Sequence, residues 1–392
     1  MKKVKILFVD DDANIINGLK RMLFPMRKEW GQYFCTSGEE ALKIVENENV
    51  DIIVTDMRMP KMNGVQLLEK VREKFPNVIR IILSGQADDE MALKSISVAH
   101  QFISKPCVPE ELKEVIKNSS DLKSHLHDNK NIQSLVAGVD QLPVLPDIYL
   151  EIEKEFNKEE RSLNKIGAIV SKNPSLTAKI LKIVNSAFFG LPKNISNPIE
   201  AVNYLGLGII KSLVLYIPLF EGVDAASNVR ASMTDLLNHC LHTANYSLDL
   251  HKKLELPNNM KDDLYIASLL HDVGKLVIMK NKEVYEQIET VIKKEKLKYH
   301  DVENELLGTS HAEIGAYLLG IWGIPNKIIE VIMNHHKLEK QTDNSFDLSN
   351  LVYISNFSQY LSPQLRTELE NYLYSNKDEI SLKTKIGELQ NG

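Results

Sequence analysis

The first part of the chain alternates between short apolar runs and amphipathic stretches, and this alternation restricts the fold more than any other feature. Runs rich in β-branched residues occur at Val4–Asp10, Tyr33–Thr36, Asp51–Asp56, Val78–Ser84 and Gln101–Ser104. Stretches with helical spacing lie between them, at Ala13–Leu23, Glu39–Val45 and Val65–Val71. Strands that alternate with helices predict a doubly wound α/β domain with five parallel strands, covered by helices on both faces.

The pattern changes after the fifth predicted strand. A helix is predicted from Pro109, and a polar, Asn- and Asp-rich stretch follows near His127–Asn131. From Leu135 onward, helical periodicity dominates. Helices are predicted at Pro146–Phe156, Leu163–Ser171, Ser175–Asn185, Ile199–Leu205, Gly208–Ile217, Ser232–Lys253, Asp262–Leu270, Lys282–Glu295, His311–Gly320 and Asn326–Asn334, with one or two more in Ser345–Gly392. We therefore expect an α/β domain at 1–120, a helical linker at 121–134, an all-α domain at 135–340 and a helical extension at 341–392.

Composition narrows the classes of protein. The length of 392 residues exceeds what one core usually serves, and the net charge of −6 comes from interspersed acids and bases. This balance, with no basic recognition helix, argues against DNA binding. The three cysteines lack CxxC spacing and predict reduced thiols in a cytoplasmic protein. The apolar stretch Leu205–Phe220 contains Lys211 and Pro218 and is too short for a membrane span.

Aspartates gather where two of the predicted strands end. Asp10, Asp11 and Asp12 close the first strand, and Asp56 closes the third. In a doubly wound sheet these ends are neighbours at the point where strand order reverses. Crowded carboxylates repel one another unless a cation intervenes, and Mg²⁺ prefers such oxygen ligands. A carboxylate can also act as a nucleophile and form an aspartyl-phosphate.

Two further polar residues end the remaining strands. Ser84 closes the fourth strand, and its hydroxyl can bond a phosphoryl oxygen. Lys105 follows the fifth, and its ammonium can neutralise that oxygen. Together with the aspartates, they predict a phosphoryl-accepting site that uses Mg²⁺.

The stretches ILFVDDD, IIVTDMRMPKMNG, IILSG and FISKP resemble the response-regulator receiver family over roughly the first 120 residues. The resemblance implies that Asp56 accepts the phosphoryl group, that Asp10 and Asp11 bind Mg²⁺, and that a sensor histidine kinase is the phosphodonor. The other roles that it implies are a metal-binding carbonyl for Arg58, a phosphoryl-following hydroxyl for Ser84, a charge partner for Lys105 and an aromatic switch for Phe102.

Histidines and aspartates form a second pattern in the helical region. His271 and Asp272 are adjacent in SLLHDVGKL, and Asp235 and His239 lie upstream, four residues apart on one helix. His311 opens a later predicted helix, and His335–His336 end another. Imidazole nitrogens with carboxylate oxygens suit Fe, Mn or Zn. A metal site is therefore one interpretation, and histidines paired with acids without an ion are the other.

This spacing resembles the HD superfamily of metal-dependent phosphohydrolases. The resemblance implies that His239, His271 and Asp272 are the first histidine and the signature pair. His311, His335, His336 and Asp235 match further ligands of its bimetallic branch, which includes the HD-GYP phosphodiesterases of cyclic di-GMP. Asn356 stands where that pattern ends in aspartate, Lys337 stands where HD-GYP proteins have glutamate, and the GYP tripeptide is absent.

A second resemblance covers about Leu135 to Lys340. The stretches LPVLPDIYLEI, IGAIVSKNPSLTAKILKIVNSAFFG and ISNPIEAVNYLGLGIIKSLVL are similar to the HDOD domain, an HD-related output domain. HDOD domains have the HD fold and usually serve as signalling or scaffold modules, which implies a non-enzyme.

The sequence as a whole predicts a two-component response regulator. Phosphorylation of Asp56 would control an HDOD output domain that contacts a downstream protein. Two alternatives remain, namely an HD phosphohydrolase acting on a nucleotide or cyclic dinucleotide, and a nucleotide-binding sensor. The sequence leaves open which partner is bound and whether the chain forms a homodimer.

Overall fold

The computed structural model describes residues 3–84, 98–105, 109–127, 147–156, 158, 162–172, 176–177, 180–181, 195, 197–216, 227–295, 297, 299–337 and 347–375. Residue contacts divide the chain into two compact units. One holds Met1–Asp147, Glu283–Ser310 and Tyr317–Asn326, and the other holds Ile148–Lys282, His311–Ala316 and Lys327–Gly392.

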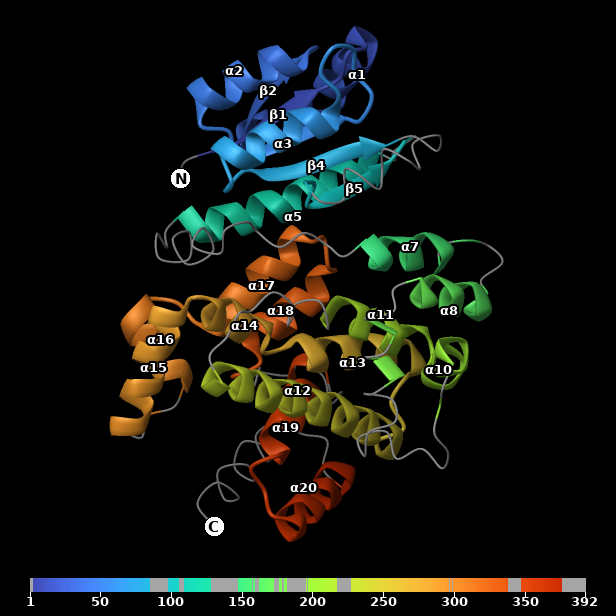
Figure 1. Ribbon diagram of the computed structural model, residues 1–392, viewed down its shortest axis with the longest axis vertical. Helices are drawn as coiled ribbons and strands as arrows, with labels where there is room; N and C mark the ends of the chain where they lie inside the picture. The colour runs from blue at the N-terminus through green and yellow to red at the C-terminus, as the bar shows by residue number, and fades with distance from the viewer. Residues whose placement is uncertain are drawn as a thin grey trace. The chain divides into compact units, whose positions relative to one another are not determined.

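The first unit contains a five-stranded sheet in the order β2-β1-β3-β4-β5 (Figure 1). Its strands are β1 (Val4–Val9), β2 (Trp30–Cys35), β3 (Ile52–Asp56), β4 (Ile79–Ser84) and β5 (Gln101–Ser104). All neighbouring pairs are parallel, as the sequence predicts. The order reverses between β1 and β3, so the ends of these two strands form the ligand-binding edge typical of such sheets.

Helices cover both faces of the sheet because side chains alternate along each strand. Leu7, Val9 and Ile53 point to a core shared with helices α2 (Gly38–Glu48) and α3 (Gly64–Lys74). On the strands' other side, α1 (Ala13–Leu23) contacts β2 and α5 (Pro109–His127) contacts β1. These buried contacts hold the strand ends in fixed positions.

Strand β2 begins at Trp30, three residues before the predicted start at Tyr33. Gly31 interrupts the run of strand-forming residues in the sequence. Parallel pairing of Val4 with Trp30 and of Lys5 with Gly31 extends the strand regardless. Pairing with a neighbouring strand therefore overrides the local preference at this position.

The rest of the described chain is helical. Its helices are α7 (Asp147–Phe156), α8 (Leu163–Ser171), α10 (Pro198–Leu205), α11 (Leu207–Tyr216), α12 (Ser227–Lys253), α13 (Lys261–Leu270), α14 (Val273–Lys280), α15 (Lys282–Glu295), α16 (Tyr299–Leu307), α17 (His311–Ile321), α18 (Asn326–Asn334), α19 (Leu348–Ser358) and α20 (Pro363–Ser375). The predicted helix at Ser175–Asn185 lies mostly outside the described residues.

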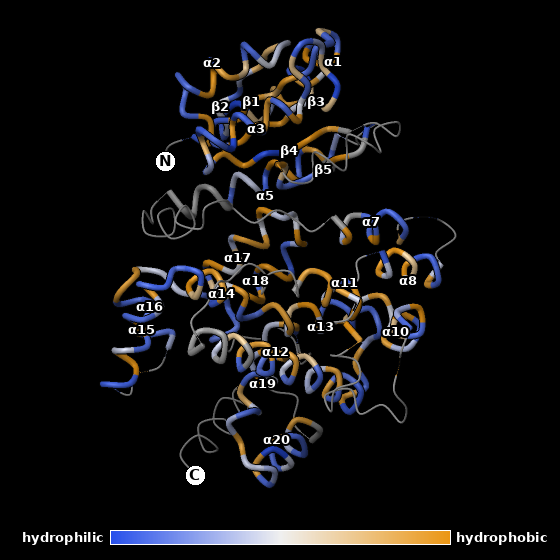
Figure 2. The backbone as a smooth tube through the Cα atoms, in the orientation of Figure 1, coloured by the Kyte–Doolittle hydropathy of each residue, from blue (hydrophilic) through white to orange (hydrophobic). Residues whose placement is uncertain are grey.

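Helix α13 is central to the second unit. Every residue from Leu264 to Leu270 is buried, and α13 contacts α11, α12 and α19. A helix that is apolar on all sides is stable only when other elements surround it. Helices α11 and α17 are likewise mostly hydrophobic along their length (Figure 2).

Two helices were not expected from the sequence. Helix α14 follows α13 almost at once, and it contains Gly274, a residue that disfavours the helix interior. Helix α16 has only a short apolar pattern, with buried Val302 and Leu307.

No single helix among the described residues is long and apolar enough to cross a membrane. Helices α10 and α11 together reach the length and apolar composition of a membrane-spanning segment, but the chain bends by 117° between them.

Candidate functional site

The end of β1 and the end of β3 bring Asp10 and Asp56 close to Lys105. The Nζ of Lys105 donates to Oδ2 of Asp10 at 2.7 Å and also to Oδ1 of Asp56. Both carboxylates are buried, with exposed fractions of 2% for Asp10 and 9% for Asp56. The backbone N–H of Arg58 donates to the other oxygen of Asp56 at 2.7 Å.

Burial raises the pKa of Asp56 above its ordinary value, although Lys105 works in the opposite direction. Burial alone would lower the pKa of Lys105, but its hydrogen bonds to Asp10 and Asp56 outweigh burial and raise it. One ammonium therefore serves two carboxylates, which leaves a net negative charge at the edge of the sheet. That surplus, made of oxygen donors, fits a divalent cation such as Mg²⁺.

The three consecutive aspartates have different surroundings. Asp10 is buried, whereas Asp11 and Asp12 are exposed. The Asp12 side chain caps α1 by accepting a hydrogen bond from the N–H of Asn14 at 2.7 Å. Asp12 is therefore occupied at the helix start, while Asp11 is exposed beside the buried Asp10. The side chains of Ser84 and Phe102 lie outside the described residues.

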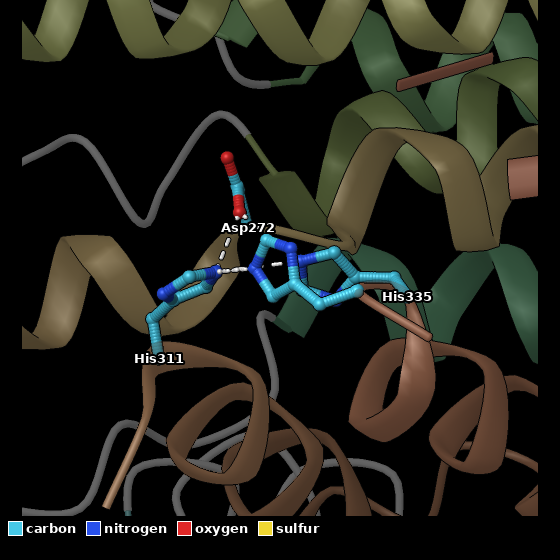
Figure 3. Close-up of side chains that lie close together, drawn as sticks. Asp272, His311 and His335 are labelled. Carbon is cyan, nitrogen blue, oxygen red and sulfur yellow. Dashed lines mark hydrogen bonds and ion pairs between the residues drawn. The ribbon is translucent and has the colours of Figure 1, made fainter. Parts of the chain in front are cut away.

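The second candidate site is a cluster of five histidines around Asp272, named the HD cluster here. Its members are His239, His271, Asp272, His311, His335 and His336. Figure 3 shows His311 and His335 directed at Asp272. His336, His239 and Lys275, which contacts Asp272, are partly open to solvent, and the side chains of His239 and Lys275 are each 19% exposed. Asp272 itself is 1% exposed.

Three helix ends and one helix interior place these donors. His271 and Asp272 form the link between α13 and α14, and His335 and His336 form the turn after α18. His311 is the first residue of α17, and His239 lies within α12.

Gly274 allows α14 to approach α17. A Cβ at this position would lie 1.9 Å from the carbonyl oxygen of His311 and 2.7 Å from the backbone nitrogen of Gly315. No side chain fits at these distances, so the two helices meet backbone to backbone. This contact sets the distance between Asp272, two residues before Gly274, and His311.

Hydrogen bonds fix the tautomers of three of the histidines. The Nδ1 of His271 lies 2.7 Å from the carbonyl oxygen of Ser268, and the Nδ1 of His335 lies 2.6 Å from that of Ile332. A carbonyl oxygen only accepts, so each Nδ1 carries the proton and each Nε2 presents a lone pair.

Gln359 does the same for His239. Its amide nitrogen donates to the backbone oxygen of His239 and to Thr243, so its oxygen must face Nδ1 of His239, at 3.0 Å. The Nε2 of His239 therefore also presents a lone pair. Such partners on the far ring nitrogen are typical of histidines that bind metals.

These lone pairs converge without protons between them. The Nε2 atoms of His239 and His271 are 3.1 Å apart, and each lies within 3.4 Å of Oδ2 of Asp272. The Nε2 of His335 lies 3.5 Å from Oδ1 of Asp272, which is buried and makes no hydrogen bond within the described parts of the chain. Facing acceptors repel one another unless a cation lies among them.

The protonation states agree with metal binding. Burial lowers the pKa of His271 and of His336, and lowers that of His335 to about 3. Burial opposes ionisation of Asp272, but Lys275 and the neighbouring histidines outweigh it and hold the pKa of Asp272 well below its usual range. The cluster thus offers neutral imidazoles and one carboxylate, a donor set that suits Fe, Mn or Zn.

Two residues expected at this site lie differently. Asp235 is exposed, one turn before His239 on α12, and belongs to neither group of converging donors. Asn356 lies one turn before Gln359, which is the residue that contacts His239. The Oδ1 of Asn356 is buried and has no hydrogen-bond partner among the described residues.

Lys275 and Gln359 also belong to this site, and neither was predicted from the sequence. The Nζ of Lys275 donates to Oδ2 of Asp272 at 2.6 Å. Its place three residues after Asp272, within one helical turn, was a signal that could have been read. Gln359 offered none, because its role depends on how α19 packs against α12.

Two family models match the chain. Residues 6–117 match the response regulator receiver domain, and residues 142–338 match the HDOD domain.

Individual relatives match parts of the chain. An uncharacterized protein of Treponema pallidum is 25% identical over 72% of this chain and 52% of its own length. The hydrogenase transcriptional regulatory protein HoxA of Cupriavidus necator is 32% identical over 30% of this chain and 24% of its own. The chain thus spans about half the length of the first relative and about a quarter of the second.

Among solved structures, an HDOD domain protein of unknown function from Geobacter sulfurreducens is 27% identical, with a TM-score of 0.49. The match covers 59% of this chain and 76% of that one.

Proposed function

Since the chain belongs to the HDOD family and carries a response regulator receiver domain, we propose that phosphorylation of Asp56 controls its helical output domain. The observation that supports this proposal is the joint contact of Lys105 with Asp10 and Asp56 at the switch point of the sheet. The proposal keeps the domain limits expected from the sequence, which are 1–120, 121–134, 135–340 and 341–392.

In this proposal the carboxylate of Asp56 attacks the phosphorus atom of a phosphohistidine on a sensor kinase. The O–P bond forms as the P–N bond breaks, and the kinase histidine leaves as an imidazole. Asp10, Asp11 and Asp56, with the carbonyl of Arg58, would hold Mg²⁺, which neutralises phosphoryl oxygens when bound. Lys105 then bonds the phosphoryl group in place of the free carboxylate. The added charge draws Lys105 and Ser84 toward the phosphoryl group, and Phe102 follows as the switch.

Phosphorylation is tested on the full-length protein with a small acyl phosphate and Mg²⁺. Intact-mass measurement should find one added phosphate, and Asp56→Asn should add none. Lys105→Ala is the matched variant, because it keeps the nucleophile and removes the charge partner. It should still be labelled but should show a smaller spectroscopic difference between its two states. Labelling of the Asn variant would refute the assignment of Asp56.

For the output domain, we propose a signalling module that contacts a downstream protein and holds a metal ion in the HD cluster. The buried, hydrogen-bond-free Oδ1 of Asp272 among imidazole nitrogens supports the metal. The same observation favours a second candidate function, a metal-dependent phosphohydrolase acting on a nucleotide or cyclic dinucleotide. A bound Fe, Mn or Zn ion would supply an activated water for that reaction.

Elemental analysis and a turnover assay separate these two functions. Purified protein that contains metal but leaves cyclic and linear dinucleotides intact supports the signalling module. Turnover that is lost in Asp272→Ala supports the phosphohydrolase, provided that His300→Ala, a histidine outside the HD cluster, retains it. Protein without metal after reconstitution with Fe, Mn and Zn would refute the metal site in both functions.

A further inference from the structure

The C-terminal half of α17 belongs to the same compact unit as the receiver domain. The HDOD match covers residues 142–338, yet Tyr317–Asn326 within it falls in the first unit, which also holds the whole sheet. The N-terminal half of α17, His311–Ala316, falls in the second unit. One continuous helix is therefore shared by both units.

A glutamine on the sheet caps the end of this helix. The amide nitrogen of Gln101 donates to the carbonyl oxygen of Ile321 at 2.8 Å and to that of Gly320 at 3.3 Å. Carbonyl groups in the last turn of a helix lack the N–H partners that later residues supply in its interior. Gly323, with a φ of 74°, turns the chain away, and a Cβ there would lie 3.2 Å from Oε1 of Gln101. The glutamine side chain therefore packs directly against the turn that ends α17.

The receiver surface around this contact is polar and buried. Gln101 is 7% exposed, and Ser119 and Ser120 on α5 are 0% and 5% exposed. The amide nitrogen of Gln101 also lies 3.4 Å from the hydroxyl oxygen of Ser119. Serine and glutamine side chains are mostly exposed in folded proteins. Their burial on an edge strand and the adjoining helix indicates a surface that is made to be covered.

Two further contacts lie beside that of Gln101. The amide nitrogen of Asn326, the first residue of α18, donates to Oδ1 of Asn118 on α5 at 2.7 Å. Tyr317 is buried; burial raises the pKa of its phenol, and the charge of Arg80 on β4 opposes that rise. Contacts of Tyr317–Asn326 with the receiver domain thus involve residues of β4, β5 and α5.

We propose that the face formed by β5 and α5 holds the C-terminal half of α17 in the unphosphorylated protein, and that phosphorylation of Asp56 releases it. This inference rests on the proposed phosphorylation and names the segment on which it acts. Gln101 is a positioning residue in this scheme, because it acts through the helix end that it caps.

Strand β5 connects the phosphorylation site with the end of α17. Gln101 is the first residue of this strand of 4 residues, and Lys105 directly follows its last. Within the described sheet β5 is an edge strand paired with β4, so it shifts more readily than a strand held on both sides. Movement of Lys105 from Asp10 toward a phosphoryl group on Asp56 therefore displaces Gln101.

The strengths of the two sets of contacts favour release. Lys105 would form charge-assisted hydrogen bonds with the phosphoryl group, which are about twice as strong as neutral ones. Gln101 forms neutral hydrogen bonds with Gly320 and Ile321, and water replaces such bonds at small net cost. Release frees the end of a helix whose first residue, His311, belongs to the HD cluster.

Hydrogen exchange of the full-length protein, followed by mass spectrometry, tests the inference at the amides of Trp322 and Ile324. These amides donate to the carbonyl oxygens of Leu318 and Leu319, so they exchange when the last turn of α17 opens. After incubation with an acyl phosphate and Mg²⁺, they should exchange roughly tenfold faster, as expected for the loss of one or two neutral hydrogen bonds. Asp56→Asn should show no change.

Gln101→Ala removes the contact without phosphorylation. The unphosphorylated variant should exchange roughly tenfold faster at the same amides, and phosphorylation should add no further increase. Gln101→Glu keeps the size of the side chain but has no N–H, so it should behave in the same way even if the alanine variant fails to fold. Gln32→Ala is the matched control. Its amide nitrogen donates to the carbonyl oxygen of Leu23, at the end of α1, at 2.8 Å, so the variant loses an equivalent bond and should leave exchange in α17 unchanged.

Two results would overturn the inference and leave the proposed phosphorylation intact. One is unchanged exchange of the α17 amides in folded Gln101→Ala and Gln101→Glu. The other is unchanged exchange in wild-type protein that intact-mass measurement shows to be fully phosphorylated. A wild type that takes up no phosphate would refute the proposed function and the release with it, whereas the Gln101 variants decide separately whether the contact exists.

Discussion

Replacement of Gly274 by alanine should destabilise the helical output domain and disturb the HD cluster. The new Cβ would lie 1.9 Å from the carbonyl oxygen of His311 and 2.7 Å from the backbone nitrogen of Gly315. Both obstacles are backbone atoms, so no side-chain rotation can relieve the clash. Helix α14 must move away from α17, which separates Asp272 from His311.

The magnitude follows from two opposing effects. Alanine in place of glycine inside a helix stabilises by about 1 kcal/mol. Overpacking against fixed neighbours costs about 1–3 kcal/mol, and a clash with backbone belongs at the upper end of that range. The net loss is about 1–2 kcal/mol, which lowers the melting temperature of a domain of this size by about 2–8 °C.

Scanning calorimetry measures this change, and Gly18→Ala is the matched control. A Cβ at Gly18, within α1, would have no heavy atom within 4 Å, so alanine should raise the melting temperature of the receiver domain there. After reconstitution with Fe, Mn or Zn, Gly274→Ala should also retain less metal than the wild type. A Gly274→Ala protein that melts at or above the wild-type temperature would refute the backbone-to-backbone contact.

Two further predictions concern the receiver domain. Burial raises the pKa of Asp56 above 3.8, so the ionised carboxylate destabilises the fold above that raised pKa and costs nothing below about pH 3.8. Without Mg²⁺, Asp56→Asn should therefore raise the unfolding midpoint at about pH 7 and lose this advantage near about pH 3; an equal gain at both pH values would contradict it. Burial also raises the pKa of Cys35 to about 12, so its thiolate fraction at about pH 8 should be roughly a thousandfold below that of a thiol with the ordinary pKa of 9.0. Native protein should leave Cys35 unmodified by iodoacetamide, as peptide mapping would show, while unfolded protein should not; rapid native modification would be incompatible with the buried thiol.

The sequence alone was sufficient for the α/β domain and the positions of its polar strand ends. Short apolar strands that alternate with helices have few ways to bury their apolar faces, and parallel pairing brings their carboxyl ends to one edge. Asp10, Asp56 and Lys105 could therefore be predicted as neighbours although 95 positions separate Asp10 from Lys105. The lower limit of β2 was wrong because pairing with β1 extends it through Gly31.

The helices of the second domain could be predicted from the sequence, but the geometry of its HD cluster could not. Local periodicity indicated α8, α15 and α18 at their observed limits, because each has an apolar face of helical spacing. His271 and Asp272 are adjacent in the sequence, so their closeness could be predicted without the tertiary structure. The spacing of the other histidines matched a known pattern, but it contained no information about which oxygen of Asp272 each would face.

Only the tertiary structure determines which histidines face each oxygen of Asp272. It places His239 and His271 against Oδ2 of Asp272, and His311 and His335 against Oδ1. It also adds Lys275, which donates to Oδ2. These contacts join helices far apart in the chain, and their distances depend on how closely the backbones of α14 and α17 approach. That approach is set by the missing side chain of Gly274 and by packing around it, which no local sequence pattern encodes.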